Sequence, residues 1–595
     1  MTNRPNVPDR LRAFGPFVDA GLLGNTELQA TAALARLAPE TPCDVLLAYA
    51  FAVRAPLWGH VCVDLATIAI APPVDDPTVV LPWPEPSDWQ QSIESSPLVR
   101  PLSADNAHSL LRRRPLAIEG SRVYLDRYAR YEQLVAHQLR RRTGPPRSVD
   151  DALLNQFFPD DPDDKQRQAA RVALASNLAV IAGGPGTGKT RTVARLLAAM
   201  LSDAASTGAM LSVGLAAPTG KAASRMTEAI RGELNDLDLI PEVYRTLSTI
   251  EATTIHRLLG PAGDNRFLHD RQNPLPHDVV VVDESSMVSL PLMARLLDAL
   301  RADARVVLVG DPYQLASVEA GAVLGDLIDS SDLPDSIVRA HTVALDRVHR
   351  FGADSGIAHL AGAIRRGDVD AALAVIDDPA YPDAVLVDPA DHDAIAHLLE
   401  LTGAAATAVI DAAKRGDDAQ ALLAASAVKV LAATREGPLG VQWWADQIFA
   451  RSADSLARSD LYNPWYVGRP LLVTQNDPVQ RVFNGDVGVV VDHHDVRSLA
   501  LADQGAGGVR YLPVVRLRAV ETWWSMTIHK SQGSEFPAVI VSLPSVPSPI
   551  MSRELLYTGV TRAKERVVIV ASRRSLAGAI NRRVERTSGL TGLLQ

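Results

Sequence analysis

The sequence predicts an α/β protein built around two parallel β-sheets, and three patterns along the chain lead to that prediction. From Asp163 to about Arg350, short apolar runs of strand type alternate with helical patterns, as in sheets whose strands are buried on both faces. A second alternating set begins at Val428 and continues toward the C-terminus. Within this second set, at about residues 469–520, short segments separated by Asn, Asp and Gly predict a small all-β insert.

The length of 595 residues exceeds what one hydrophobic core can organise, so three or four domains are expected. No stretch approaches the roughly 20 consecutive apolar residues of a membrane span, and the N-terminus lacks the apolar segment of a signal peptide. The two cysteines, Cys43 and Cys62, cannot form a disulfide framework. These features predict a cytoplasmic protein with no membrane partner. The net charge of −10 argues against coating nucleic acid by bulk electrostatics, but it permits a locally basic channel.

Residues 1–145 are expected to form a mainly helical N-terminal domain, with a strand-like run from His60 and a basic helix from Leu134. The segment TGPPRSVDD from Thr143 combines Gly, two Pro and polar residues, as domain linkers do. The N-terminal segment has core-like apolar runs but neither a phosphate loop nor the side chains of a metal site. This composition predicts a partner-docking domain that folds and moves semi-independently.

The first α/β domain is expected to span residues 146–350, and the second, with its insert, residues 351–595. Right-handed crossover helices between the strands of each domain give a parallel sheet. The expected strands are LAVIAG from Leu178, SVGLAAP from Ser212, VVVVDE from Val279, ARVVLVGD from Ala304, VKVLAAT from Val428, AVIVSL from Ala538 and RVVIVAS from Arg566.

A glycine-rich segment follows the first of these strands and opens a predicted helix, which is the context that a phosphate-binding loop requires. Its backbone N–H groups can surround a β-phosphate, and the helix N-terminus adds positive potential. Lys189 is expected to reach the β- and γ-phosphates of ATP, and Thr190 to bind Mg²⁺. A glycine-rich turn before an ordinary helix is the alternative. The segment consists of Gly183, Gly184, Pro185, Gly186, Thr187, Gly188, Lys189 and Thr190.

Four further residues, in three segments, carry side chains suited to nucleotide binding and hydrolysis. Asp283 and Glu284 end an apolar strand at the sheet edge where ligands of such folds bind, so Asp283 is expected to hold Mg²⁺ and Glu284 to polarise the attacking water. Gln314 follows the next strand, and its uncharged amide can contact both the γ-phosphate and that water. Gln166 is a candidate for binding adenine. The respective alternatives are a solvated strand end, a surface turn and a helix-surface glutamine.

The order of these segments resembles the RecD-like branch of the superfamily 1 DNA helicases over about 430 residues. The resemblance implies two RecA-like motor domains, an SH3-like insert and ATP-driven 5′-to-3′ movement along single-stranded DNA. It rests on Gln166, the phosphate loop, APTGKAASRM from Ala217, TIHRLLG from Thr254, DESSM from Asp283, GDPYQLASVEAG from Gly310, LDRVHRF from Leu345, TREGPLG from Thr434, FNGDVG from Phe483, TIHKSQGSEF from Thr527 and LLYTGVTRAK from Leu555.

The resemblance also implies roles for residues that composition alone does not single out. Arg350 and Arg562 correspond to arginine fingers that neutralise charge on the γ-phosphate. Gly533 and Glu535 correspond to the nucleotide side, with Glu535 near the ribose. The implied DNA contacts, most of which suit phosphate binding without sequence readout, are Pro218, Thr219, Lys221, His256, Thr527, His529 and Lys530. Of the neighbouring Trp523 and Trp524, at most one is expected to face DNA, because adjacent strand residues point to opposite faces.

Two N-terminal segments, GHVCVDLA from Gly59 and YLDRYARYE from Tyr124, resemble the domain with which RecD-like subunits dock on a RecC-like subunit. The resemblance thus implies a heterotrimer with RecB-like and RecC-like subunits that unwinds and degrades double-stranded DNA ends in break repair, with the nuclease in the RecB-like partner. A free-standing helicase is the nearest alternative. A nucleotide-switched scaffold is a second, against which the hydrolytic residues argue.

Overall fold

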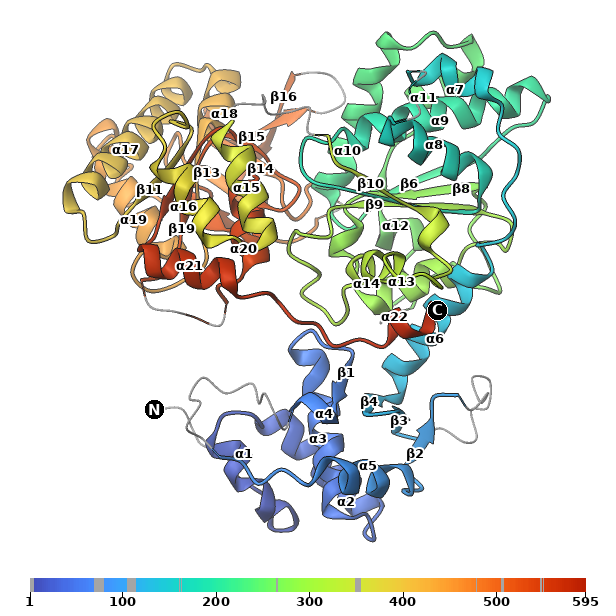
Figure 1. Cartoon of the computed structure of the whole chain (residues 1–595). Coiled ribbons are helices and arrows are strands. Elements are labelled where there is room, and N and C mark those ends of the chain that lie inside the picture. Colours follow the sequence, from blue (N-terminus) through green and yellow to red (C-terminus); the bar gives the residue numbers. More distant parts are fainter. Residues whose placement is uncertain are drawn as a thin grey trace.

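The computed structural model describes the whole chain except residues 1–4, 69–79, 104–113, 160, 162, 264–265, 348–354, 478, 504–507, 546–547 and 549. Three lobes make up the molecule (Figure 1). Two α/β lobes lie side by side, and the N-terminal lobe lies below the first of them. The expected α/β fold with two parallel sheets is confirmed.

The N-terminal lobe combines helices with a four-stranded sheet of order β1-β4-β3-β2, in which only β2 and β3 run parallel. Sequence patterns indicated one of these strands and missed the others, because each has only three or four residues. The elements are α1 Gly15–Asp19, α2 Asn25–Leu37, α3 Cys43–Leu57, β1 Cys62–Asp64, α4 Leu65–Ile68, α5 Pro86–Glu94, β2 Val99–Pro101, β3 Leu116–Glu119, β4 Arg122–Leu125 and α6 Asp126–Arg140.

The first motor domain contains a six-stranded, fully parallel sheet of order β10-β5-β9-β8-β6-β7. Its strands are buried on both faces: Val279 and Val281 of β8 join one core, and Val280 and Val282 join the other. The elements are α7 Asp151–Phe157, α8 Lys165–Ala175, β5 Leu178–Gly183, α9 Lys189–Ser206, β6 Val213–Ala217, α10 Gly220–Glu233, α11 Pro241–Thr249, β7 Thr253–Thr254, α12 Ile255–Leu259, β8 Val279–Val282, α13 Leu290–Asp298, β9 Arg305–Gly310, α14 Val323–Ser331 and β10 Thr342–Leu345.

The second motor domain contains a five-stranded parallel sheet of order β11-β20-β19-β12-β18. All seven strands expected in the two sheets are present. The elements are α15 Gly356–Arg366, α16 Val369–Asp377, β11 Ala384–Val387, α17 His392–Lys414, α18 Asp418–Ala427, β12 Val428–Ala432, α19 Val441–Ser452, β18 Ser525–Thr527, β19 Phe536–Ser542, α20 Arg553–Val560, β20 Ala563–Val570, α21 Arg573–Asn581 and α22 Leu590–Leu593.

The β insert emerges from the second motor domain as a separate antiparallel sheet of order β16-β15-β14-β13-β17. Its strands are β13 Pro470–Val473, β14 Val487–His493, β15 Val496–Asp503, β16 Gly508–Pro513 and β17 Val520–Thr522. Short 3₁₀ turns connect many elements of the chain: Asp9–Phe14, Leu234–Asp236, Ser285–Met287, Arg339–His341, Ala453–Ser455, Val514–Arg516 and His529–Ser531.

Helix α6 ties the N-terminal lobe to the first motor domain, although the sequence predicted a semi-independent lobe. Val135 and Leu139 of α6 are buried in one core with Leu290 and Met293 of the motor. Residues 144–150 form the expected irregular linker, but the helix before it is already packed on the motor. The packing of α6 argues against semi-independent movement of this lobe, because separation would expose that core.

The last residues of the chain, 582–595, cross from the second motor domain to the N-terminal lobe (Figure 1). We call this segment the C-terminal tail. Arg586 donates to the carbonyl oxygens of Gly59 and Glu319, at 3.2 and 3.0 Å. The Ser588 hydroxyl donates to Glu132 at 2.7 Å, and α22 packs against α6 and α14. The tail thus joins all three lobes.

Helix α17 is the one helix among the described residues that is long and apolar enough to cross a membrane by length and composition alone. A core helix can pass the same test. Leu398, Thr402, Ala406 and Val409 are buried, and the helix packs against α18 and α19. Its apolar character is therefore accounted for by the core of the second motor domain.

Candidate active site

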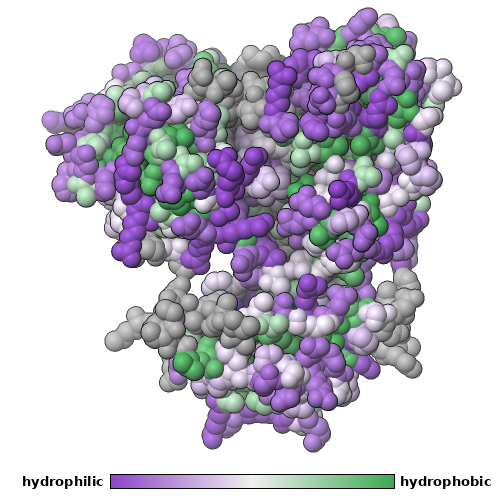
Figure 2. Space-filling model, in the orientation of Figure 1, coloured by the Kyte–Doolittle hydropathy of each residue, from purple (hydrophilic) through white to green (hydrophobic). Residues whose placement is uncertain are grey.

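A cavity of about 420 Å³ lies between the two motor domains, and both domains contribute to its walls. Figure 2 shows a hollow between the two upper lobes, bordered by many hydrophilic side chains. The lining residues are Pro185, Gly186, Gly188, Lys189, Thr190, Arg191, Ala222, Arg225, Met226, Ala229, Asp283, Glu284 and Gln314 from the first domain, with Gly533, Glu535 and Arg562 from the second.

The glycine-rich loop runs from the end of β5 to the start of α9. Gly186 and Gly188 have φ angles of 77° and 80°, a conformation that favours glycine. Lys189 donates to the carbonyl oxygens of Gly183 and Gly184, at 2.7 and 2.9 Å. The Thr187 hydroxyl also bonds within the loop, to Gly184, so Gly183, Gly184 and Thr187 shape the loop without lining the cavity.

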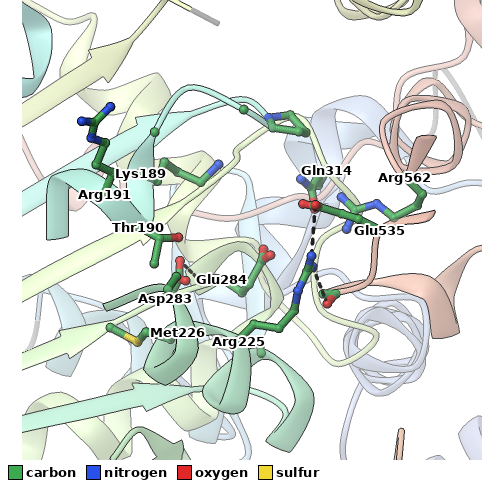
Figure 3. Close-up of a pocket in the computed structure, with 16 residues that line it drawn as sticks. Lys189, Thr190, Arg191, Arg225, Met226, Asp283, Glu284, Gln314, Glu535 and Arg562 are labelled. Carbon is green, nitrogen blue, oxygen red and sulfur yellow. Dashed lines mark hydrogen bonds and ion pairs between the residues drawn. The ribbon is translucent and has the colours of Figure 1, made fainter. Parts of the chain in front are cut away.

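Asp283 and Glu284 follow β8 on the floor of the cavity (Figure 3). Burial, together with the charge of Glu284, raises the pKa of Asp283 to about 6. The Lys189 ammonium opposes this shift. Glu284 has a φ of 50°, unusual for a residue other than glycine, and its N–H donates to the Asp283 carboxylate at 2.8 Å. The two carboxylates are thus held beside Lys189 and Thr190.

Gln314 and Arg562 approach the cavity from opposite domains. Gln314 is 5% exposed and donates to Asp311 at 3.0 Å. Arg562, 3% exposed, donates to the backbone oxygens of Thr558 and Ser534 at 3.1 and 3.2 Å. Burial lowers the pKa of Arg562, and the charge of Glu284 partly offsets this effect. Arg350, the other expected arginine finger, lies outside the described residues.

Glu535 lines the cavity from the second domain, where an arginine that sequence patterns did not single out meets it. Arg225 of α10 lies 3.0 Å from Glu535 and donates to the Gly533 carbonyl at 2.8 Å (Figure 3). Ala222, Arg225 and Met226 share one face of α10 with Ala229, because they are spaced by three or four residues. That spacing is the sequence signal that could have indicated that one face of α10 forms a wall of the cavity.

Gln166, near the start of α8, donates its side-chain amide to the Thr187 carbonyl at 3.1 Å. Gln166 thus contacts the backbone of the phosphate loop and does not line the cavity. Its amide is therefore engaged with the protein backbone in this structure.

The predicted DNA-contacting residues of the first domain follow β6 and β7. Pro218 directly follows β6, and Thr219 caps α10 by accepting the Ala222 N–H at 3.2 Å. The Lys221 ammonium lies 5.9 Å from the Trp523 ring of the second domain, and burial lowers the pKa of Lys221 to about 8. His256 is exposed at the start of α12, 5.8 Å from the ring of Phe267.

The second-domain candidates lie at the end of β18. The Thr527 hydroxyl accepts the Lys530 N–H at 3.3 Å, and the Lys530 ammonium lies 2.5 Å from Glu521. Burial lowers the pKa of His529, with a further contribution from Arg586 of the C-terminal tail. Of these three candidates, Lys530 is exposed, whereas Thr527 and His529 are half-buried.

Trp523 and Trp524 are both buried, at 2% and 7% exposure, so neither faces solvent as a stacking platform. The Lys429 ammonium lies 3.5 Å from the Trp523 ring, and Trp524 donates to the Tyr466 hydroxyl at 2.9 Å. The sequence predicted that at most one of the two tryptophans faces DNA, which left room for one exposed ring. The structure instead places both in the core, because they lie between β17 and β18 in the interior of the domain.

The chemistry of the cavity fits a nucleoside triphosphate with Mg²⁺. Lys189 and Arg562 supply positive charge for phosphate oxygens, whereas Asp283 and the Thr190 hydroxyl supply hard oxygen donors. Within the described part of the chain, no three His, Cys, Asp or Glu side chains group as a metal site. A few protein oxygens suffice, because Mg²⁺ in such sites is also bound by substrate phosphates and water.

Comparisons with known proteins agree with this arrangement. The RecBCD enzyme subunit RecD N-terminal domain family matches residues 19–124, an AAA domain matches residues 162–381, and a UvrD-like helicase C-terminal domain matches residues 522–570. The chain is 30% identical to the ATP-dependent RecD2 DNA helicase of Deinococcus radiodurans over 81% of its own length and 59% of that protein.

Another group of relatives has higher identity and is covered over more of its own length. The chain is 35% identical to the RecBCD enzyme subunit RecD of Haemophilus influenzae, covering 74% of each protein. It is 43% identical to the RecBCD enzyme subunit RecD of Mycolicibacterium smegmatis, covering 96% of the chain and 97% of that protein. The N-terminal match and this nearly full-length identity show that the chain belongs to the family of RecBCD enzyme subunit RecD.

Proposed function

We propose that the chain is the ATP-dependent DNA helicase motor of a RecBCD-type complex, which moves 5′ to 3′ along single-stranded DNA. The observation that carries this proposal is the cavity between the motor domains. Lys189 and Glu284 face it from one domain, and Arg562 faces it from the other. Because the two sets of groups meet only when the domains approach, binding and release of nucleotide can drive relative movement of the domains.

The hydrolytic roles follow from charge and position. Lys189 binds the β- and γ-phosphates, and Arg562 neutralises charge that develops on the γ-phosphate. Glu284 accepts a hydrogen bond from the attacking water, which Gln314 helps to orient. Thr190 and Asp283 hold Mg²⁺, and the ion supplies charge neutralisation at the phosphates. Arg350 is assigned as a second arginine finger from the family resemblance alone.

The DNA track is assigned to Pro218, Thr219, Lys221 and His256 of the first domain, continued by Thr527, His529 and Lys530 of the second. Support comes from their positions just after β6, β7 and β18. Strand β6 lies beside β8, whose end carries Asp283 and Glu284 of the cavity, and Lys221 directly precedes Ala222 of the cavity wall. Hydroxyl, imidazole and ammonium groups bind phosphate oxygens of any sequence, as a translocating motor requires.

The polarity can be tested with single strands that carry streptavidin at one end. A 5′-to-3′ motor displaces streptavidin from the 3′ end much faster than from the 5′ end. Faster displacement from the 5′ end would refute the proposed direction.

The proposed partners are RecB-like and RecC-like subunits encoded by the same genome, acting together on double-stranded DNA ends in the cytoplasm. The matched N-terminal domain supports this choice over a free-standing helicase, as does the full-length identity to RecBCD subunits. Co-expression followed by pull-down of this chain is expected to recover both partners in a 1:1:1 complex. Recovery of this chain alone, with helicase activity intact, would favour the free-standing alternative.

A further inference from the structure

Helix α10 begins between the two motor domains and contacts the second domain and its insert. A Cβ atom on Gly220 would lie 3.6 Å from the Phe483 side chain of the insert. Lys221 approaches the ring of Trp523, and Ala222 lies against Gly533, where an added Cβ would be 3.7 Å away. The first turn of a first-domain helix is therefore in contact with the other half of the motor.

One turn later, Arg225 extends from the same helix into the nucleotide cavity. Its guanidinium contacts two acceptors of the second domain, the Gly533 carbonyl at 2.8 Å and the Glu535 carboxylate at 3.0 Å. Figure 3 shows both contacts beside Glu284 and Gln314. A planar guanidinium can serve two acceptors at once, which a lysine ammonium does with less geometric definition.

Both partners of this contact have other charges close by in their own domains. Glu535 lies 3.7 Å from Lys564 of the second domain. In the first domain, Arg225 lines the cavity together with the carboxylates of Asp283 and Glu284 (Figure 3). When the domains separate, each group therefore keeps an opposite charge nearby. This arrangement suits a contact that forms and breaks in every cycle, because neither charge is left isolated in the open cleft.

Lys221 and Arg225 are separated by four residues and lie on one side of α10, about 6 Å apart along the helix axis. Lys221 is among the proposed DNA contacts, whereas Arg225 lines the nucleotide cavity. A short, rigid helical segment thus connects the two ligand sites. If α10 moves when Arg225 forms or breaks its contact at the nucleotide cavity, Lys221 at the DNA site must move with it.

We propose that Arg225 is a positioning residue that holds the nucleotide cleft closed by bonding to Gly533 and Glu535, and that α10 thereby couples nucleotide binding to the grip on DNA. This inference rests on the proposed function and deepens it. In this inference Arg225 controls closure of the nucleotide cleft, and the Glu535 carboxylate forms the ion pair with Arg225. Removal of this bond should therefore weaken the coupling between the two ligands more than it weakens either site alone.

The test is the Kd of a fluorescent oligothymidylate, measured with the full-length chain in the absence and presence of saturating adenylyl imidodiphosphate. The ratio of the two Kd values measures the coupling. In the wild-type protein the ratio is expected to differ from one. Arg225→Ala is expected to reduce the coupling, so that the ratio of the two Kd values moves toward one by a factor of about five. A factor of about five is the lower end of typical coupling between two sites. The variant is also expected to raise the KM for ATP by a larger factor than it lowers kcat.

Arg191→Ala is the matched control. Arg191 lines the same cavity, but its ion pair, at 3.2 Å, is with Glu233 of the same domain. The control removes the same charge from the cavity and leaves the contact between domains intact, so its coupling ratio should equal that of the wild type. Glu535→Gln removes the negative charge but leaves the Gly533 carbonyl as an acceptor, so it should give a partial loss. The double variant should show no loss beyond that of Arg225→Ala.

Arg225→Lys keeps the charge and provides a second variant if the alanine protein does not fold. It is expected to give an intermediate ratio, because an ammonium restores one of the two contacts. A wild-type ratio of one, an unchanged ratio in Arg225→Ala, or additive losses in the double variant would overturn the inference. Absence of DNA-stimulated ATP hydrolysis in the wild-type chain would instead refute the proposed function, so the two failures are distinguishable.

Discussion

The first motor domain has two large contacts with the rest of the chain, and they differ in chemistry. Toward the second motor domain, backbone groups beside the cavity make polar contacts: the Leu315 N–H donates to the Thr558 hydroxyl at 2.9 Å, and the Leu315 carbonyl accepts from Gln532 at 2.8 Å. The Leu315 side chain is the apolar part of this contact and joins the second-domain core. Toward the N-terminal lobe, the contact is an apolar core in which Leu139 of α6 and Leu590 of the tail are fully buried.

This difference indicates which contact moves. Polar contacts across a cavity exchange with water at small net cost, because each group regains hydrogen bonds when the contact opens. Separating an apolar core would expose surface at about 25 cal/mol per Å², with no compensation. The nucleotide cleft is therefore expected to open and close, while the N-terminal lobe and the C-terminal tail stay fixed to the first motor domain.

The largest expected effect comes from a substitution that abolishes catalysis in the nucleotide cleft and leaves the apolar contact with the N-terminal lobe unchanged. Lys189→Gln is expected to lower ATP hydrolysis by about 10²–10³-fold, because its contact with the transferring phosphate is worth about 3–4 kcal/mol in the transition state. Steady-state phosphate release measures the loss. Unchanged thermal unfolding would show that the fold is intact, and unchanged turnover would refute the role of the phosphate loop.

The fixed contact can be weakened at Glu132, which is fully buried and accepts from Ser588 and from the Gly589 N–H at 2.7 and 3.0 Å. Glu132→Ala leaves both donors without this acceptor and is expected to cost about 1–3 kcal/mol of unfolding free energy. Denaturant titration measures the change. Glu132→Gln keeps an accepting oxygen and serves as the control with the smaller loss. Equal stability of all three proteins would show that the tail is loosely attached.

The DNA side of the cleft is tested by the double variant Lys221→Ala and His256→Ala. It is expected to weaken binding of single strands of any sequence by about tenfold, and to reduce the salt dependence of log Kd by about 0.7 for each phosphate that the variant no longer binds. Fluorescence titration at several salt concentrations measures both quantities. Lys414→Ala on α17 is the control for removal of a positive charge. An effect confined to one base sequence would indicate base readout and contradict the assignment.

The smallest expected effect concerns pH at the fixed contact. Asp326 of α14 is partly buried, and burial, followed by the charge of Glu132, raises its pKa well above the usual 3.8. For such an acid, the stabilising contribution is complete below pH 3.8 and is lost as the pH rises through the raised folded-state pKa. Asp326→Asn removes the buried charge. It is therefore expected to be more stable than the wild type at pH 8.5, with no gain near pH 4.

Thermal unfolding of Asp326→Asn and the wild type across this range measures the pH effect. A side-chain hydrogen bond with Ser588 partly offsets the shift in the pKa of Asp326. A constant difference in stability at every pH would mean that Asp326 does not titrate at this contact.

The sequence was sufficient to predict the parallel sheets and the phosphate loop because each depends on local patterns. Four consecutive valines at 279–282 suit a strand buried on both faces, and the glycines before Lys189 suit a loop with positive φ. The limits of the insert were also close to the observed sheet, Pro470–Thr522, because turn residues separate its strands. The likeness of this insert to an SH3 fold stays a prediction.

Contacts between distant segments were not predictable from local patterns. The tail from Arg582 has no strand or helix periodicity, and its role depends on Gly59 and Glu132, which lie more than 400 positions earlier. The spacing of Arg225 with Ala222 and Met226 indicates a shared helix face, but its contact with Glu535 of the other domain could not be predicted from that spacing. Semi-independence of the N-terminal lobe was inferred from the linker, which carries no information about the packing of α6.

The central claim is that nucleotide hydrolysis and DNA binding share one cleft. The most direct measurement is the rate of ATP hydrolysis by the purified full-length chain, with and without saturating oligothymidylate. The account predicts a clear rise in kcat when DNA is present and no rise in Lys189→Gln. A wild-type rate that does not respond to DNA would contradict the account, because the cleft would then bind nucleotide without reporting to DNA.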